Sequence, residues 1–299
     1  MSEATKRKIM KSEKLIGTMM LLAVMLTTSC KQSVMPKENA VYYWRTEWRT
    51  DSVERAFLQQ YHINKVYCRY FDVVMNSDGE PIPNATIHFV QGQLPNIKLI
   101  PTVFITENCM HQTHKDLAKK LVDRIVQMNE TNDISGIDEI QIDCDFTARN
   151  RKNYYDFLQQ VRDEAQKHGM RLSTTIRLHQ LSMPVPPVDY GVLMIYNTGD
   201  PNKFNERNPI LDMRDVHPYL RYLSDYDLPL AAAYPTFRWI RNFEGVHLEH
   251  TVEADEILKV KAAMEKKRPE LRNTILTYHL DKDNINHYKL ETYEAIYHH

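Results

Sequence analysis

The segment Glu139-Ile140-Gln141-Ile142-Asp143-Cys144-Asp145 decides the fold of this chain. Its apolar and polar side chains alternate with a period of two, which is typical of a β-strand. The isoleucines and Cys144 therefore share one face of the strand, whereas Gln141, Asp143 and Asp145 share the other. Because an apolar face of this kind packs against helices, we expect the two carboxylates to point into the interior of a closed sheet.

Strand-like runs of the same kind recur along the chain and alternate with helical patterns. Asn150 is the predicted N-cap of the third helix, and Gly169 is its predicted C-terminal stop. Eight strands in this alternation favour an α/β fold, a single-domain (β/α)8 barrel of the TIM type. The predicted strands cover residues 41–44, 65–71, 98–105, 139–145, 171–177, 192–196, 230–234 and 274–278, and the predicted helices cover residues 52–61, 114–129, 150–168, 209–224 and 254–267.

The competing architecture is a doubly wound open sheet, which normally has a glycine-rich first turn. The chain has 8 glycines among 299 residues, and no two stand close enough to form a G-x-G-x-x-G turn, a P-loop or a G-x-S-x-G nucleophile motif. A formal net charge of −1 gives no electrostatic reason to expect a nucleic-acid partner. These absences argue against the common nucleotide-binding folds and favour the barrel.

Residues 1–29 have the pattern of a lipoprotein signal peptide. A basic segment precedes a short apolar run, and the stretch that ends in Ser29-Cys30 resembles a bacterial lipobox. The apolar run is shorter than the roughly 20 residues that a membrane span needs. We therefore expect lipidation at Cys30, a tether at residues 30–39 and the barrel at residues 40–299. An ordinary secretory signal is the alternative, and Met10 offers a second start site.

A lipid at Cys30 would anchor the protein to a bacterial membrane in the cell envelope. No acidic run follows Cys30, so we expect the protein to face the periplasm. The other cysteines are Cys68, Cys109 and Cys144, and they form neither a disulfide framework nor a C-x-x-C pair. Their predicted role is core packing, where a free cysteine acts as a small hydrophobic residue.

Functional residues of a (β/α)8 barrel lie at the C-terminal ends of its strands. Asp143 and Asp145 occupy one such end and are about 6.6 Å apart along the strand. Each carboxylate raises the cost of ionising the other, and a carboxyl group that keeps its proton can act as a general acid. Asp145 and Asp143 are therefore the candidate catalytic residues. The alternative is a structural network in which Arg69, Arg177 or Arg238 supplies the counter-charge.

Residues 136–145 resemble the fourth-strand D-x-x-D-x-D-x-E signature of the family 18 glycoside hydrolases, the chitinase-like barrels. In an ungapped alignment Asp138, Gln141, Asp143 and Asp145 take the four positions of the signature. The resemblance implies that Asp145 stands where the family has its proton-donating Glu, and that Asp143 orients the acetamido group of the substrate. Asp145 is one methylene shorter than that Glu, and Gln141 replaces an acid.

Met194-Ile195-Tyr196-Asn197 similarly resembles the sixth-strand M-x-Y-D motif of that family, with Asn197 in place of the Asp. The resemblance implies that Tyr196 supports the acetamido group. A second likeness, which spans more of the chain, is to a bacterial family of uncharacterised glycosidase-like barrels with a Q-I-D-x-D fourth strand. Residues 141–145, the polar turn at 147–151 and the aromatic helix start at 154–158 follow that pattern. This second likeness implies the fold but does not imply an activity, because that family has no established one.

Further candidates are aromatic, amide and basic residues near the predicted strand ends, because rings stack on sugars and polar groups bind their hydroxyls. Two pairs of histidines have a spacing that a metal could use, but neither is followed by a third ligand, so no metal or other cofactor is expected. Tyr70 and Tyr234 offer further rings. The substrate-binding candidates are Gln141, Tyr196, Asn197, Arg69, Arg177, His179, Trp44 and Trp239.

Two functions fit these residues. The first is a membrane-anchored, glycosidase-like barrel that acts on a glycan, with Asp145 as general acid and Asp143 as its orienting partner. Assistance by the substrate itself would account for the lack of a separate nucleophile. The alternative is a catalytically inactive barrel lipoprotein that binds a glycan or a partner protein, which the amides of Gln141 and Asn197 favour. The expected partners are a glycan or another small-molecule ligand and, through Cys30, the membrane.

Overall fold

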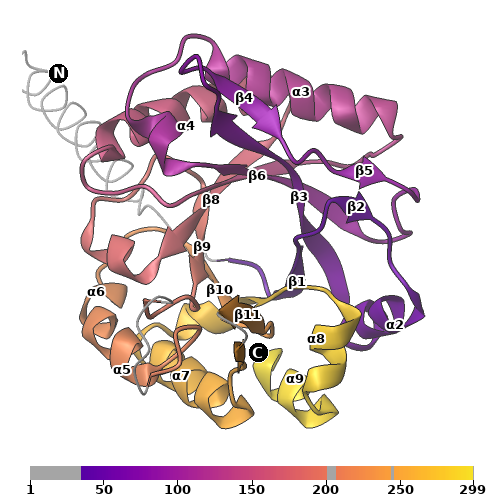
Figure 1. Ribbon diagram of the computed structural model, residues 1–299, viewed down its shortest axis with the longest axis vertical. Coiled ribbons are helices and arrows are strands. Elements are labelled where there is room, and N and C mark those ends of the chain that lie inside the picture. The colour runs from indigo at the N-terminus through magenta and orange to yellow at the C-terminus, as the bar shows by residue number, and fades with distance from the viewer. Residues whose placement is uncertain (1–34, 201–206, 244–245, 299) are drawn as a thin grey trace, which may run out of the picture. The chain divides into compact units, whose positions relative to one another are not determined.

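A computed structural model describes residues 35–200, 207–243 and 246–298 of the chain. Eight parallel strands close into a barrel in the order β1-β13-β10-β9-β8-β7-β6-β3, and pairing between β3 and β1 completes the ring (Figure 1). The predicted (β/α)8 barrel is therefore confirmed. Its strands are β1 (Glu38–Tyr43), β3 (Ile63–Met75), β6 (Lys98–Ile105), β7 (Glu139–Cys144), β8 (Arg171–Arg177), β9 (Tyr190–Met194), β10 (Leu230–Pro235) and β13 (Thr274–Tyr278).

All eight predicted strands are present, and three of them, β1, β3 and β9, start earlier than expected. β9 begins at Tyr190, because this side chain points into the barrel, where its hydroxyl lies 2.9 Å from that of Tyr67. β1 begins at Glu38, inside the predicted tether. The preceding Met35 is already buried, and the Pro36 carbonyl accepts a hydrogen bond of 2.6 Å from a threonine of β13. The chain is thus fixed to the barrel from Met35 onward.

The predicted signal peptide and Cys30 lie outside the described residues. Within the described ranges, no helix combines the length and the apolar character needed to span a bilayer. Cys68, Cys109 and Cys144 are free and buried, which confirms their predicted role in core packing.

The helices surround the barrel (Figure 1). The predicted helix over residues 209–224 is interrupted, because Pro218 lacks an N–H group and its ring does not fit the interior of a continuous helix. Gly169 is the predicted stop and has a left-handed φ of 71°. The helices are α2 (Ser52–Gln60), α3 (Leu117–Thr131), α4 (Arg151–Gln166), α5 (Met213–Val216), α6 (Leu220–Leu223), α7 (Ala254–Lys267), α8 (Lys282–His287) and α9 (Leu290–Ile296).

Asn150 precedes α4 as predicted, but its side chain makes no capping bond to the helix. The side-chain Oδ1 atom of Asn150 accepts a hydrogen bond of 2.8 Å from the Thr147 backbone N–H, and its side-chain Nδ2 donates to the Glu107 carboxylate at 2.6 Å. Asn150 therefore fixes the loop after β7 to the loop after β6. Smaller elements decorate the barrel, namely β2 (Glu47–Trp48), β4 (Pro81–Asn84), β5 (His88–Phe89), β11 (Trp239–Phe243), β12 (Val246–His250) and four short 3-10 helices.

The faces of β7 and β8 follow the predicted alternation. Ile142 and Thr174 are register partners, and the Thr174 hydroxyl lies 2.7 Å from that of Tyr154 on α4, so this face meets the helices. On the opposite, inner face, the Ser173 hydroxyl donates to the Glu139 carboxylate at 2.7 Å. The polar residues of β7 therefore line the barrel interior.

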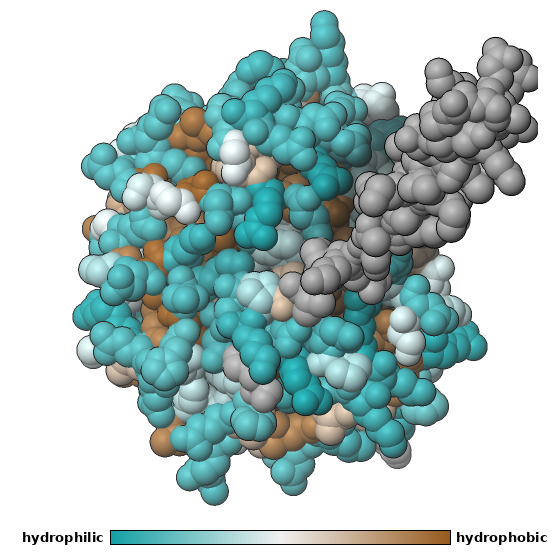
Figure 2. Space-filling model, turned by 180° about the vertical axis from the view of Figure 1, so that it is seen from behind, coloured by the Kyte–Doolittle hydropathy of each residue, from teal (hydrophilic) through white to brown (hydrophobic). Residues whose placement is uncertain are grey.

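The described surface is mostly polar. In Figure 2 apolar side chains are scattered in small groups among hydrophilic ones. The large apolar side chains exposed on the described surface are Ile82, Val90 and Leu290, and Leu290 lies far from the other two in the sequence.

Gly191 on β9 is a sensitive packing position. A Cβ atom at this residue would lie 2.8 Å from Cγ1 of Ile176 and 3.0 Å from methyl groups of Leu228 and Leu230. We expect Gly191→Ala to lower the free energy of unfolding by about 1–3 kcal/mol, as overpacked cores do. Urea titration measures this difference. Gly92→Ala is the matched control, since no atom lies within 4 Å of the added carbon. Equal stability of both variants would contradict the packing shown here.

Candidate functional site

The C-terminal ends of the strands form an open mouth, which contains a cavity of about 250 Å³. Two of its charged groups come from neighbouring strands, because Asp145 follows β7 and Arg177 ends β8. Parallel strands end at the same edge of a barrel, so these side chains meet there. The cavity is lined by Asp145, Arg177, Leu178, His179, Tyr196, Asn197, Thr198 and Tyr219.

Arg177 joins the two candidate acids. Its Nε atom donates to the Asp145 carboxylate at 2.5 Å, and its Nη2 atom lies 3.7 Å from Asp143. Burial lowers the pKa of Arg177, but the two carboxylates outweigh this effect and the net shift is upward. The guanidinium therefore stays charged between two acids. Arg177 is thus the counter-charge that the sequence left open among three arginines.

Asp143 and Asp145 differ sharply in their surroundings. The Asp143 side chain is 4% exposed and accepts a hydrogen bond of 2.6 Å from Thr175, whereas the Asp145 side chain is 55% exposed. Burial raises the pKa of Asp143; the Arg177 guanidinium opposes this shift, and the Asp145 carboxylate adds to it. Asp143 is therefore the acid of this pair that burial biases toward its protonated form.

Gln141 lies deeper than the acids, whereas Tyr196 follows the end of β9 and lines the mouth cavity. The Gln141 side chain is fully buried and accepts a hydrogen bond of 2.9 Å from Tyr42, which keeps it inside the barrel below the mouth. The Tyr196 hydroxyl is buried and has no hydrogen-bond partner among the described residues. Burial raises the pKa of Tyr196 well above its ordinary value, so the hydroxyl keeps its proton. Tyr196 therefore has a donor to offer to a ligand in the cavity.

Aromatic rings form a row across the mouth. The centroid distances are 5.8 Å from Trp44 to Tyr278, 5.1 Å from Tyr278 to Tyr196, 5.3 Å from Tyr278 to Phe237 and 6.3 Å from Phe237 to Trp239. Tyr278 is the centre of this row, although it was not among the predicted site residues. Its position as the last residue of a predicted strand is the signal that could have identified it.

The structure excludes the roles predicted for Tyr70, Tyr234 and Arg238. Tyr70 and Tyr234 are fully buried, and the Tyr70 hydroxyl donates to Asn129 on α3, so neither ring is open to a sugar. Arg238 pairs with Glu249 at 3.1 Å rather than with the acids of β7. His179 and Asn197 are exposed at the rim of the mouth, where Asn197 has a left-handed φ of 54°.

A second cavity at the mouth, of about 440 Å³, lies beside Trp44 and Arg69. Arg69 donates two hydrogen bonds to the Asp72 carboxylate, one of them 2.7 Å long from Nε. Its guanidinium carbon lies 5.6 Å from the centre of the Trp44 ring. Arg69 thus belongs to the mouth as predicted, but its partner is Asp72 and not Asp143 or Asp145.

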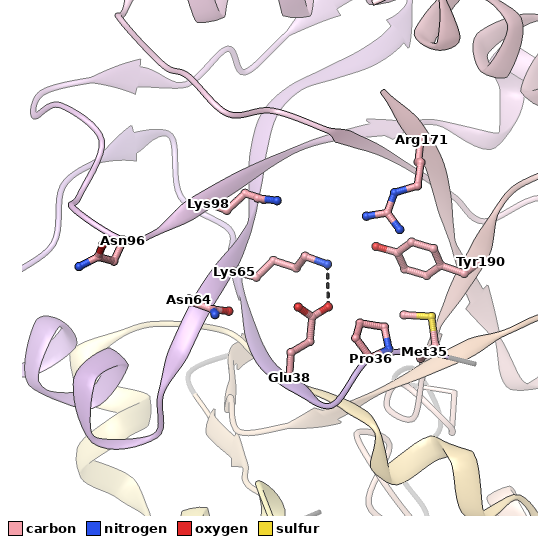
Figure 3. A pocket seen from close by; sticks show the side chains of 9 residues that line it. All are labelled: Met35, Pro36, Glu38, Asn64, Lys65, Asn96, Lys98, Arg171 and Tyr190. Carbon is pink, nitrogen blue, oxygen red and sulfur yellow. Dashed lines mark hydrogen bonds and ion pairs between the residues drawn. The ribbon is translucent and has the colours of Figure 1, made fainter. Parts of the chain in front are cut away.

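A third cavity, of about 240 Å³, lies at the opposite end of the barrel, which we call the floor. Figure 3 shows Lys65, Lys98 and Arg171 around Glu38 in this cavity. Lys65 pairs with Glu38 at 2.8 Å, and Lys98 pairs with Asp138 at 2.9 Å. Barrel enzymes carry their catalytic residues at the other end of the barrel. The charged groups of the floor already have partners. We therefore place the candidate site at the mouth.

No group of three or more His, Cys, Asp or Glu side chains in the described part of the chain could hold a metal ion.

The raised pKa of Asp143 leads to a prediction about its titration when Arg177 is replaced. Because Arg177 lowers this pKa and burial raises it, we expect Arg177→Gln to shift the Asp143 titration to higher pH. The raised pKa of Asp143 also predicts how the free energy of unfolding changes with pH. A group with a raised folded-state pKa stabilises the protein below its unfolded-state pKa, and this contribution is lost as the pH rises through the folded-state pKa. Carboxyl NMR titration measures the shift, with Asp143→Asn used to assign the signal. A titration of Asp143 below the ordinary range of Asp in the wild type would contradict the burial argument.

No protein-family model and no curated protein matches this chain. Its structure is similar to a chitinase from Bacteroides thetaiotaomicron, with a TM-score of 0.59 and 14% identity over 88% of this chain and 99% of that one. A GH18 chitinase from Pseudoalteromonas aurantia gives a TM-score of 0.52 and 13% identity over 87% and 98% of the two chains. The spore cortex-lytic enzyme SleL of Bacillus cereus gives a TM-score of 0.52 and 15% identity over 83% and 72%. The chain thus has the (β/α)8 barrel fold of these glycoside hydrolases.

Proposed function

We propose that the mouth of the barrel binds a glycan without cleaving it, and that a lipid at Cys30 holds the protein at a bacterial membrane, facing the periplasm. The observation that carries this proposal is the ion pair of 2.5 Å between Arg177 and Asp145. Asp145 takes the position of the proton donor in the family that the fourth strand resembles. A general acid must carry a proton and present it to the substrate, whereas the Asp145 carboxylate accepts a hydrogen bond from the charged guanidinium of Arg177.

Two neighbouring groups support binding rather than hydrolysis. Gln141 is fully buried and hydrogen-bonded to Tyr42, so it is held as part of the barrel interior. Asn197 at the rim is an amide where the resembled motif has an acid. Neither amide can act as a proton donor or as an anionic partner in the way a carboxyl group does.

A glycan fits the remaining features of the mouth. Sugar rings present apolar C–H faces that pack on aromatic rings and hydroxyls that need polar partners. The row of rings from Trp44 through Tyr278 to Trp239 offers the aromatic surface for the C–H faces. Tyr196 and Asn197 beside the cavity offer polar partners for the hydroxyls. The fold shared with chitinases and a cortex-lytic enzyme is consistent with this class of ligand.

Hydrolysis is the second candidate function, with Asp145 as general acid and Asp143 as its orienting partner. The observation that favours it is the raised pKa of Asp143, to which the Asp145 charge contributes. A coupled pair of acids can hold one proton between its members at a pH at which an isolated Asp is ionised.

A glycan array with the full chain in detergent separates the two functions. We expect saturable binding to at least one class of glycan and no shortened product by mass spectrometry after long incubation. Trp44→Ala should weaken this binding about tenfold, since a ring contact contributes on the order of 1 kcal/mol beyond its buried area. Leu290→Ala, an exposed apolar residue outside the mouth, is the control and should bind as the wild type does.

Two outcomes would overturn the proposal. Products that form with the wild type and disappear with Asp145→Asn would establish hydrolysis in place of binding alone. Absence of binding to every glycan on the array would refute a glycan as the ligand.

The anchor is tested independently of the mouth. We expect the full chain to take up labelled fatty acid in bacterial cells and to sediment with the membranes, because two or more acyl chains give stable membrane attachment. Cys30→Ser should carry no label and should appear in the soluble fraction. An unlabelled wild-type chain would refute lipidation and would leave the glycan proposal untouched.

A further inference from the structure

We propose that the cavity beside Trp44 binds an acidic group of the glycan, a carboxylate or a sulfate. This inference rests on the proposed function, because it assumes that the mouth holds a glycan and adds which chemical class of glycan it selects. We call this site the arginine cavity. It has a volume of about 440 Å³ and is lined by Tyr43, Trp44, Arg45, Thr46, Glu47, Arg49 and Arg69.

Arg45 is held in place from behind. Its Nη2 atom donates to the Glu54 carboxylate at 2.8 Å and to the Arg49 carbonyl at 3.0 Å, and the Glu54 side chain is only 1% exposed. Glu54 is itself fixed as part of the capping box of α2. The buried Nε atom of Arg45 has no hydrogen-bond partner among the described residues. The bonds to Glu54 and Arg49 therefore hold the Arg45 guanidinium in a fixed position on the cavity wall.

Arg69 is oriented in the same manner. Its Nε and Nη2 atoms are used by Asp72, whose side chain is 10% exposed, and this leaves Nη1 for another partner. The guanidinium also lies against Trp44, at 5.6 Å from the ring centre. A sugar that packs on Trp44 would therefore have the Arg69 charge within reach of its substituents.

Arg49 supplies the charge that no carboxylate within the described ranges offsets by an ion pair. It is exposed, and its backbone carbonyl and N–H, not its side chain, bond to the Tyr43 hydroxyl and to Arg45. Glu54 and Asp72 offset Arg45 and Arg69, and the exposed Glu47 is the opposing charge on the cavity wall. An acidic ligand would thus be attracted by the Arg49 charge and repelled by the Glu47 charge.

The chemistry of arginine narrows the ligand to an oxyanion. A guanidinium presents parallel N–H groups that match the oxygens of a carboxylate or a sulfate, and such charge-assisted bonds are stronger than neutral ones. Arg45 and Arg69 are held by buried carboxylates, so little side-chain freedom is lost when they bind. Three arginines beside a half-exposed tryptophan therefore fit an acidic sugar better than a neutral one.

Two exposed residues with opposite charges provide a matched test. On an array that contains neutral, uronate-bearing and sulfated glycans, we expect the wild type to prefer the acidic ones. Arg49→Gln should weaken binding to acidic glycans about tenfold, the equivalent of one charge-assisted hydrogen bond. Glu47→Gln should strengthen binding to the same glycans, because it removes a repulsive charge. Binding of both variants to any neutral glycan should stay within twofold of the wild type.

Each result has a definite meaning. Both residues are exposed, so thermal unfolding at the wild-type temperature confirms that the variants fold. The uronate and sulfate arms decide which acidic group is bound, and weaker binding at higher salt supports an ionic contact. Preference for neutral glycans, or equal loss on acidic and neutral glycans in Arg49→Gln, would overturn the arginine cavity as an anion site while glycan binding stands. No binding to any glycan would instead refute the proposed function.

Discussion

Polar side chains inside a closed barrel must find their partners there, and this constraint arranges the strand pair β7 and β8. A buried charge or hydroxyl without a partner is costly, and the two strands satisfy theirs in successive steps. Ser173 donates to Glu139 at 2.7 Å near the floor, Thr175 donates to Asp143 at 2.6 Å, and Arg177 donates to Asp145 at 2.5 Å at the mouth. The candidate site is therefore the last step of a series that begins in the barrel interior.

This origin explains why the two acids of one strand differ so sharply in their surroundings. Asp143 is fixed by Thr175 and is almost completely buried, so its first role is to complete the interior. Asp145 lies one step further, where the strand has ended and solvent begins. The same alternation thus produces a group that organises the mouth and a group that a ligand can reach.

Much of the fold could be predicted because it depends on local periodicity. The alternation at residues 139–145 and seven similar runs fixed the strands and the direction of Gln141 and Asp143. The partner of the acids could not be predicted, since choosing Arg177 over Arg69 and Arg238 requires the register between strands. Tyr278 was missed for the same reason, because its role depends on rings from three other segments. The interruption of the helix predicted over residues 209–224 follows from Pro218, a local signal that the sequence itself contains.

The position of Met35 decides which end of the barrel lies nearer to the proposed lipid anchor. Met35 lines the cavity at the floor, and four residues separate it from Cys30, which together reach at most about 18 Å. The lipid proposed for Cys30 would therefore attach the barrel through the residue at its floor, Met35. β7 alone rises about 20 Å toward the other end. The tether would then join the barrel at the end opposite the mouth, so that the attachment itself leaves the mouth free for a long polymer.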